Sequence, residues 1–183
     1  MTLIELITAQ AARLKQAGVS FGHGTANAFD EAAWLVMWTL GMSIDALENH
    51  AQDMLDTAAV AKAAALIDQR ISTRVPAAYL TREAWLQNVP FYIDERSIVP
   101  RSFIAELLAD GEGTGILDAW LSDATHTVLD LCTGNGSLAV IAALAYPEIS
   151  VDAADVSADA LAIARINVDR HKLGGRIALL LAH

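Results

Sequence analysis

The feature that most constrains this fold is a strand, glycine turn, helix and strand pattern that starts near residue 127. The turn is Thr133-Gly-Asn-Gly136, which is too rich in glycine to continue either a strand or a helix. Apolar runs and helical periodicity alternate around it. The predicted strands are 128–132, 149–154 and 177–181, and the predicted helices are 137–145 and 157–172. This alternation predicts the first half, three strands, of a doubly wound parallel α/β sheet with right-handed crossovers.

Residues 1–75 carry helical periodicity and predict a small helical bundle. Thr2 and Glu5 have the spacing of a capping box. The expected helices are 3–17, 28–40 with Asn27 as its cap, a short one that begins at Ser43 or Asp45, and 57–74, which Pro76 ends. Trp34 and Trp38 share one helical face, and we expect both to belong to the core rather than to a ligand platform.

After residue 75 the helical periodicity gives way to short runs of apolar and aromatic residues. Two short aromatic runs, 84–86 and 90–93, flank Gln87-Asn88 and predict a β-hairpin. A helix capped by Ser102, a loop over 110–115 and a short helix over 116–121 are expected next. The predicted organisation is a helical domain over 1–75, a β-hairpin linker over 76–100 and a partial Rossmann-like domain over 101–183.

The charge balance narrows the classes of partner. The chain has 12 Lys and Arg against 22 Asp and Glu, a formal net charge of −10, and no basic run, so we expect a basic partner and no direct nucleic-acid ligand. No apolar stretch approaches the ~20 residues of a membrane span. The single cysteine, Cys132, cannot form an internal disulfide, and the N-terminus lacks a signal-peptide pattern. We therefore expect a cytoplasmic protein that does not associate with membranes.

A ligand site is predicted where the first strand meets the glycine turn. Backbone N–H groups of the turn, and the positive end of the helix that follows, can approach a ligand closely. Asp155 lies 19 residues after Gly136, at the end of the second strand. A carboxylate there can bind both hydroxyls of a ribose. Two cofactor classes use this arrangement, namely dinucleotides and S-adenosylmethionine.

Asp130 distinguishes the two classes. The run 134–139 matches the dinucleotide pattern G-x-G-x-x-G/A, but Asp130 would then face a pyrophosphate at an electrostatic cost. S-adenosylmethionine carries a sulfonium and an ammonium group instead, and the same carboxylate attracts these cations. We therefore favour S-adenosylmethionine. A dinucleotide, or an Asp130 that only braces the turn, remains an open alternative.

Several motifs resemble those of the HemK-like protein N5-glutamine methyltransferases, and the resemblance covers residues 20–181. They are Arg74-Val-Pro-Ala-Ala-Tyr-Leu-Thr81, Phe91-Tyr-Ile-Asp-Glu-Arg96, Val99-Pro-Arg-Ser102 and Asp130-Leu-Cys-Thr-Gly-Asn-Gly136. Within this family, Phe21-Gly-His-Gly-Thr25, Ala84-Trp85 and the Pro-Arg-Ser ending resemble the branch that modifies large-subunit ribosomal protein three. The release-factor branch, which typically reads Pro-Arg-Pro, is the alternative.

The resemblance implies a helical substrate-recognition domain and a Rossmann-like methyltransferase domain. The implied reaction transfers a methyl group from S-adenosylmethionine to a glutamine side-chain nitrogen of a basic ribosomal protein. The residues that fall on the family's cofactor loop are Cys132, Thr133, Gly134, Asn135 and Gly136, and Cys132 replaces the usual first glycine. Asp155 falls on the ribose carboxylate, and Pro100 and Arg101 fall on a segment near the cofactor. With Asp130, these residues form the predicted cofactor site.

The chain departs from the family's pattern at its C-terminus. The family's catalytic Asn-Pro-Pro-Tyr motif follows a fourth strand, and no Asn-Pro occurs here, so we assign no catalytic residue. His183 stands where the family usually has an Asp that contacts adenine. We expect an N-terminal portion of a longer enzyme, or a truncated gene product, that is catalytically incompetent by itself. The strand 128–132 would be an unpaired apolar edge that favours self-association. A non-catalytic module that binds a basic ribosomal protein is the alternative.

Overall fold

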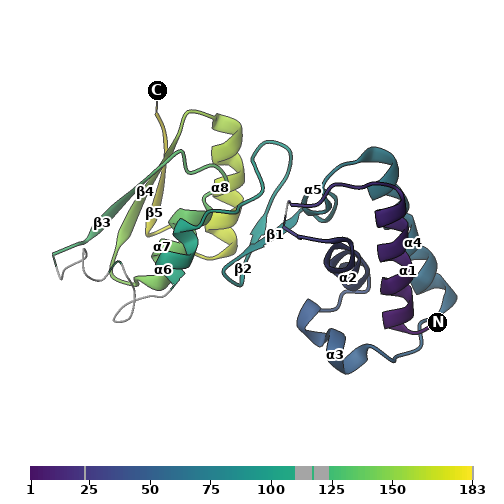
Figure 1. Ribbon diagram of the computed structural model, residues 1–183. Helices are drawn as coiled ribbons and strands as arrows, with labels where there is room; N and C mark the ends of the chain where they lie inside the picture. The colour runs from purple at the N-terminus through teal and green to yellow at the C-terminus, as the bar shows by residue number, and fades with distance from the viewer. Residues whose placement is uncertain (23, 110–116, 118–123, 183) are drawn as a thin grey trace. The chain divides into compact units, whose positions relative to one another are not determined.

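The computed structural model describes residues 1–22, 24–109, 117 and 124–182 (Figure 1). The chain divides into two compact units, Met1–Thr81 and Arg82–His183. Apart from residue 117, the loop predicted over 110–115 and the helix predicted over 116–121 lie outside the described residues, as does His183.

The first unit is helical, as its periodicity predicts. Its elements are α1 (Leu3–Gln16), α2 (Ala28–Thr39), the 3-10 turn η1 (Ile44–Ala46), α3 (Leu47–His50), α4 (Thr57–Thr73) and α5 (Ala77–Thr81). The predicted capping box is present, because Thr2 Oγ1 accepts from Glu5 N–H while the Glu5 carboxylate accepts from Thr2 N–H. Asn27 caps α2 by accepting from Asp30 N–H. These caps satisfy N–H groups that a helix leaves unpaired at its start.

The end of α4 differs from the expectation. The helix ends at Thr73 because Arg74 adopts a left-handed conformation with φ of 62°. Pro76 then opens α5, and its carbonyl accepts from Tyr79 N–H and Leu80 N–H. Proline suits a first helical turn because no N–H is needed there. The prediction that Pro76 only ends a helix leaves out α5 and is wrong in that respect.

The two tryptophans of α2 do not share one environment. Trp34 is partly buried and packs against the core of the first unit, as predicted. Trp38 is 40% exposed, so the prediction that it belongs to the core is wrong. The buried residues around Trp38 in the last turns of α2 are Leu35, Val36, Met37 and Thr39.

The second unit begins with a hairpin of β1 (Glu83–Leu86) and β2 (Val89–Tyr92), which pair antiparallel. Gln87 and Asn88 form its turn with φ of 50° and 59°. Positive φ at both central residues matches a type I′ turn, whose twist suits a two-residue hairpin. Helix α6 (Ile104–Ala109) follows, with Ser102 Oγ accepting from Ile104 N–H.

A three-stranded parallel sheet forms the rest of the second unit, as predicted. Its strands are β3 (Thr127–Leu131), β4 (Ser150–Asp155) and β5 (Ile177–Leu181), in the order β3-β4-β5. Helices α7 (Ser137–Ala145) and α8 (Ala158–Arg170) connect them, and with α6 they lie along one face of the sheet (Figure 1). Within the described residues β3 is an edge strand, and its Leu129 and Leu131 are 59% and 66% exposed. Among the described residues, none of the helices combines the length and the apolar character of a membrane span.

Candidate functional site

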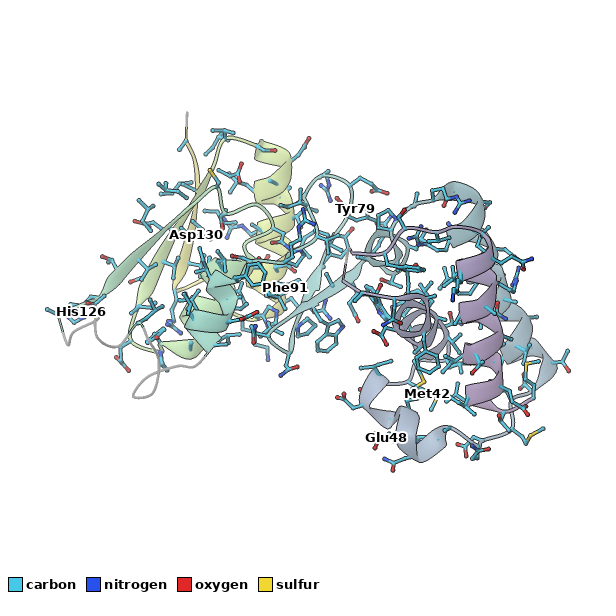
Figure 2. All side chains as sticks on the ribbon, viewed as in Figure 1. Met42, Glu48, Tyr79, Phe91, His126 and Asp130 are labelled. Carbon is cyan, nitrogen blue, oxygen red and sulfur yellow. The ribbon has the colours of Figure 1, made fainter. Side chains whose placement is uncertain are left out.

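The predicted cofactor loop lies at the carboxyl end of β3, where the chain turns into α7. Figure 2 shows Asp130 toward the other end of this strand from His126. Cys132, Gly134 and Gly136 all have positive φ, of 58°, 58° and 78°. Three left-handed residues in five make a tight turn, and its N–H groups at Thr133, Gly134 and Gly136 donate to acceptors within the protein.

At Gly136, residues of another helix occupy the space that a side chain would need. A Cβ built on Gly136 would lie 3.1 Å from the Ala164 Cβ and 3.3 Å from its Cα, on α8. Such contacts are too close for most side chains, and the positive φ adds strain to any substitution. The close packing of the loop on α8 therefore requires glycine here.

Asp155 ties the loop to the end of β4. Its Oδ2 accepts from Gly134 N–H at 2.8 Å, and its Oδ1 accepts from Ser157 N–H at 2.9 Å. Thr133 N–H also donates to Ala154 O at 3.0 Å. An ionised carboxylate offers about four acceptor positions, so each oxygen of this half-buried group retains one for a ligand. A pair of ribose hydroxyls has the donor geometry to use them.

Asp130 lies close to the same turn. Its Oδ2 accepts from the Thr133 hydroxyl at 2.6 Å. Burial raises the pKa of Asp130, and the nearby charge of Asp155 raises it further; hydrogen bonds from Thr133 and from the backbone of Ala139 oppose this shift. The carboxylate therefore braces the turn and also carries a partly desolvated negative charge, which a nearby cation would stabilise.

The other predicted residues are placed as follows. Thr133 and Asn135 are buried within the loop, and Cys132 is exposed at its start. Arg101 lies in the irregular segment before α6 and is exposed. Among the hydrogen bonds and ion pairs found between described residues, none joins Arg101 to the loop or to the two aspartates. Hydrogen bonds thus join the predicted residues of β3, the loop and β4, and the role of Arg101 stays a prediction.

Ser97 is a neighbour of the loop that no sequence motif predicted. A Cβ built on Gly134 would lie 3.4 Å from the buried Ser97 Oγ. The segment before it is fixed by Asp94, whose carboxylate accepts from the Arg96 guanidinium at 2.7 Å. Hydrogen bonding with Arg96 lowers the pKa of Asp94 to about 2. The motif over 91–96 was singled out by resemblance, but only the tertiary structure shows that this segment lies against the loop.

Asn167 is the second neighbour that was missed. It lies on α8, is fully buried, and its side-chain amide donates to Asn135 O at 2.9 Å. Its sequence signal is weak, since it is one polar residue on the otherwise apolar face of α8 formed by Ala160, Ile163, Ala164 and Val168.

Two family models match the chain. Residues 5–81 match the PrmC N-terminal domain, and residues 109–180 match the Methyltransferase small domain. The first match covers the helical unit, and the second covers the sheet, the glycine loop and both aspartates.

Relatives in the curated proteins match nearly the whole chain. One from Burkholderia pseudomallei is 51% identical over 178 residues, which cover 97% of this chain and 57% of the relative. One from Neisseria meningitidis serogroup B is 44% identical over 181 residues, covering 98% and 58%. Both are named ribosomal protein uL3 glutamine methyltransferase. The chain thus spans less than two thirds of the length of these relatives. A solved O-methyltransferase family protein from Burkholderia thailandensis is 20% identical, with a TM-score of 0.35 over 44% of this chain and 21% of that one.

Proposed function

Because the chain belongs to the family of HemK-like protein N5-glutamine methyltransferases, we propose that it carries the S-adenosylmethionine site of an enzyme that methylates a glutamine in ribosomal protein uL3. The observation that supports this most directly is the pair of aspartates around the glycine loop. Asp155 accepts from Gly134 N–H at 2.8 Å and Asp130 accepts from Thr133 at 2.6 Å, so two carboxylates border one turn.

The residues fit the chemistry of this cofactor. The loop of Cys132, Thr133, Gly134, Asn135 and Gly136 places two carboxylates and the start of α7 around one turn. Asp155 binds the ribose hydroxyls, and Asp130 attracts the sulfonium and ammonium groups. When bound, S-adenosylmethionine supplies the methyl group. Two carboxylates beside one loop favour this cationic cofactor over a dinucleotide, whose pyrophosphate they would repel.

The methyl acceptor in this family is a glutamine amide nitrogen, which gains the methyl group and gives up a proton. Such a nitrogen is a weak nucleophile. The enzyme must therefore position it and remove the positive charge that develops on it during methyl transfer. The family's Asn-Pro-Pro-Tyr motif does this, and the 183 residues contain no Asn-Pro. We therefore propose that this chain by itself binds the cofactor and does not transfer the methyl group.

Calorimetry of the 183-residue chain with S-adenosylmethionine tests the cofactor assignment. We expect saturable binding that Asp155→Asn weakens roughly 10-fold to 100-fold, since hydrogen bonds to charged groups contribute about 1.5–3 kcal/mol. Asp152→Asn is the matched control, because it removes the same charge from an exposed position of β4 and should bind like the wild type. Saturable binding of NAD, with none of S-adenosylmethionine, would overturn the assignment.

The charge of −10 supports a basic protein substrate. Binding of purified uL3 and of a release factor to the immobilised chain, compared at several salt concentrations, tests this. We expect uL3 to bind more tightly and to lose affinity as salt rises. A preference for the release factor would assign the chain to the other branch.

Incubation of the chain with methyl-labelled cofactor and uL3 tests the proposed catalytic incompetence, which measurable transfer to uL3 would disprove.

A further inference from the structure

Asn167 is an unusual residue for the centre of a packed helix face. It lies on α8 between Ile163 and Val168, two residues with no exposed surface, and is itself 0% exposed. A buried amide costs free energy unless all its polar atoms are paired. The reason for a polar side chain here should therefore lie in the groups that it binds.

The amide of Asn167 holds two different segments. Its Oδ1 accepts from Tyr92 N–H at 2.7 Å, and its Nδ2 donates to Tyr92 O at 3.0 Å. The same Nδ2 donates to Asn135 O at 2.9 Å. Both N–H donors of one side chain are thus shared between the second strand of the hairpin, β2, and the cofactor loop.

The neighbouring turn of α8 supports the loop at a second point. Ala164 lies three residues before Asn167, on the same helix face, and it contacts the position where Gly136 has no side chain. Two consecutive loop residues, Asn135 and Gly136, therefore rest on α8, one through a hydrogen bond and one through close packing. Left-handed backbone persists only where its surroundings determine it.

We propose that Asn167 is a positioning residue, which sets the backbone of the cofactor loop and couples that loop to the hairpin. The inference rests on the proposed cofactor site. Asn167 does not act on the cofactor directly; it holds Asn135 O, and thereby fixes the directions of the loop N–H groups. Because coupling between two sites is reciprocal, order imposed on the loop by a ligand also stabilises the bonds to Tyr92.

His171 offers a matched control on the same helix end. Its Nε2 is 2.8 Å from Pro90 O, and its ring packs at 5.6 Å from the Phe91 ring. His171→Phe removes a hydrogen bond to the hairpin, preserves an aromatic ring, and leaves Asn135 untouched. Val168→Ala provides a second control, because it destabilises the same helix through packing alone.

The test measures melting temperature and S-adenosylmethionine affinity for Asn167→Ala, His171→Phe and Val168→Ala in the full chain. We expect Asn167→Ala to weaken affinity roughly tenfold, which is about 1.4 kcal/mol, and the two controls to remain within about twofold at comparable losses of melting temperature. Equal effects of all three variants on affinity would show a general structural role and overturn the proposal.

Amide hydrogen exchange keeps the test decisive if Asn167→Ala does not fold. In the wild-type chain, we expect S-adenosylmethionine to slow exchange at Tyr92 N–H as well as in the loop. Protection of the loop without any change at Tyr92 would contradict the coupling. If the wild type binds no S-adenosylmethionine, the cofactor assignment fails. The positioning role is then judged separately, by faster exchange at Gly134 and Gly136 in Asn167→Ala than in His171→Phe.

Discussion

Glu31 of the helical unit and the two aspartates beside the glycine loop of the second unit differ in their burial and in their hydrogen bonds. In the helical unit, Glu31 is 2% exposed and accepts from Arg70 Nε at 2.8 Å and from the Thr25 hydroxyl at 3.1 Å. Arg70 also donates to Ser20 O and Arg74 O. In the second unit, Asp130 and Asp155 are only half-buried and accept from the turn beside them.

This difference separates a structural anchor from the proposed cofactor site. The Glu31 carboxylate is neutralised by a guanidinium and enclosed by its own unit, so no acceptor faces solvent. Asp130 has no cationic partner among the described ion pairs, and burial raises its pKa. A carboxylate held beside a turn without a counter-charge costs stability and attracts a cation, whereas a paired one only supports the fold.

The largest expected effect comes from breaking the anchor. Arg70→Met should destabilise the helical unit by about 3–5 kcal/mol, because it leaves Glu31 buried without a partner. Urea unfolding followed by circular dichroism measures this loss. Arg13→Ala removes an exposed ion pair with Asp68 in the same unit and should cost less than about 1 kcal/mol. Equal losses for the two variants would show that Glu31 and Arg70 are not an anchor.

A smaller effect is expected at Asp130, where a substitution should raise the stability of the chain rather than lower it. Burial raises its folded pKa above the unfolded value, so ionisation costs stability as pH rises through that pKa. Asp130→Asn should therefore stabilise the cofactor-free chain at neutral pH. It should also weaken S-adenosylmethionine binding roughly tenfold, about 1.4 kcal/mol. Melting curves and calorimetry measure the two changes, with Asp152→Asn as the control. A variant that is less stable and binds normally would make Asp130 a brace only.

The same carboxylate predicts a pH dependence of binding. A cationic cofactor favours the ionised form, so wild-type affinity should fall as pH drops through the raised pKa of Asp130. Calorimetry at a series of pH values measures this decline. Asp130→Asn should show a flatter profile over the same range. Identical profiles for the two proteins would assign the pH dependence to another group.

The smallest effect is expected at Cys132, where φ is 58°. Cys132→Gly should stabilise the chain by about 0.5–1 kcal/mol. Left-handed backbone costs a residue with a side chain about 1–2 kcal/mol, and the freedom of glycine in the unfolded chain offsets part of this. Lys172→Gly tests the same reasoning outside the loop, because Lys172 is an exposed residue of the same unit with a similar φ of 59°. Loss of stability in both variants would show that neither residue is strained.

Local patterns predicted most of the fold. The glycine turn, the alternation around it and the capping residues Thr2 and Asn27 predicted most of the helices and strands to within about one or two residues. The errors arose where the signal was not local. Pro76 can end one helix or begin another, and only the left-handed Arg74 decides between these. Trp38 has the right spacing for the core, but exposure depends on what lies opposite it.

By itself, the sequence determined most of the secondary structure, the order of the strands and the position of the glycine loop, because caps, turns and periodicity act over a few residues. Only the tertiary structure places Ser97 and Asn167 beside that loop. Ser97 comes 37 residues before Gly134, which it contacts, and Asn167 comes 32 residues after Asn135, to which it donates. It also shows that the Glu31 carboxylate is buried, whereas the Asp130 carboxylate is half-buried. Burial, pairing and pKa depend on groups distant in the chain, and no local pattern encodes which of them will meet.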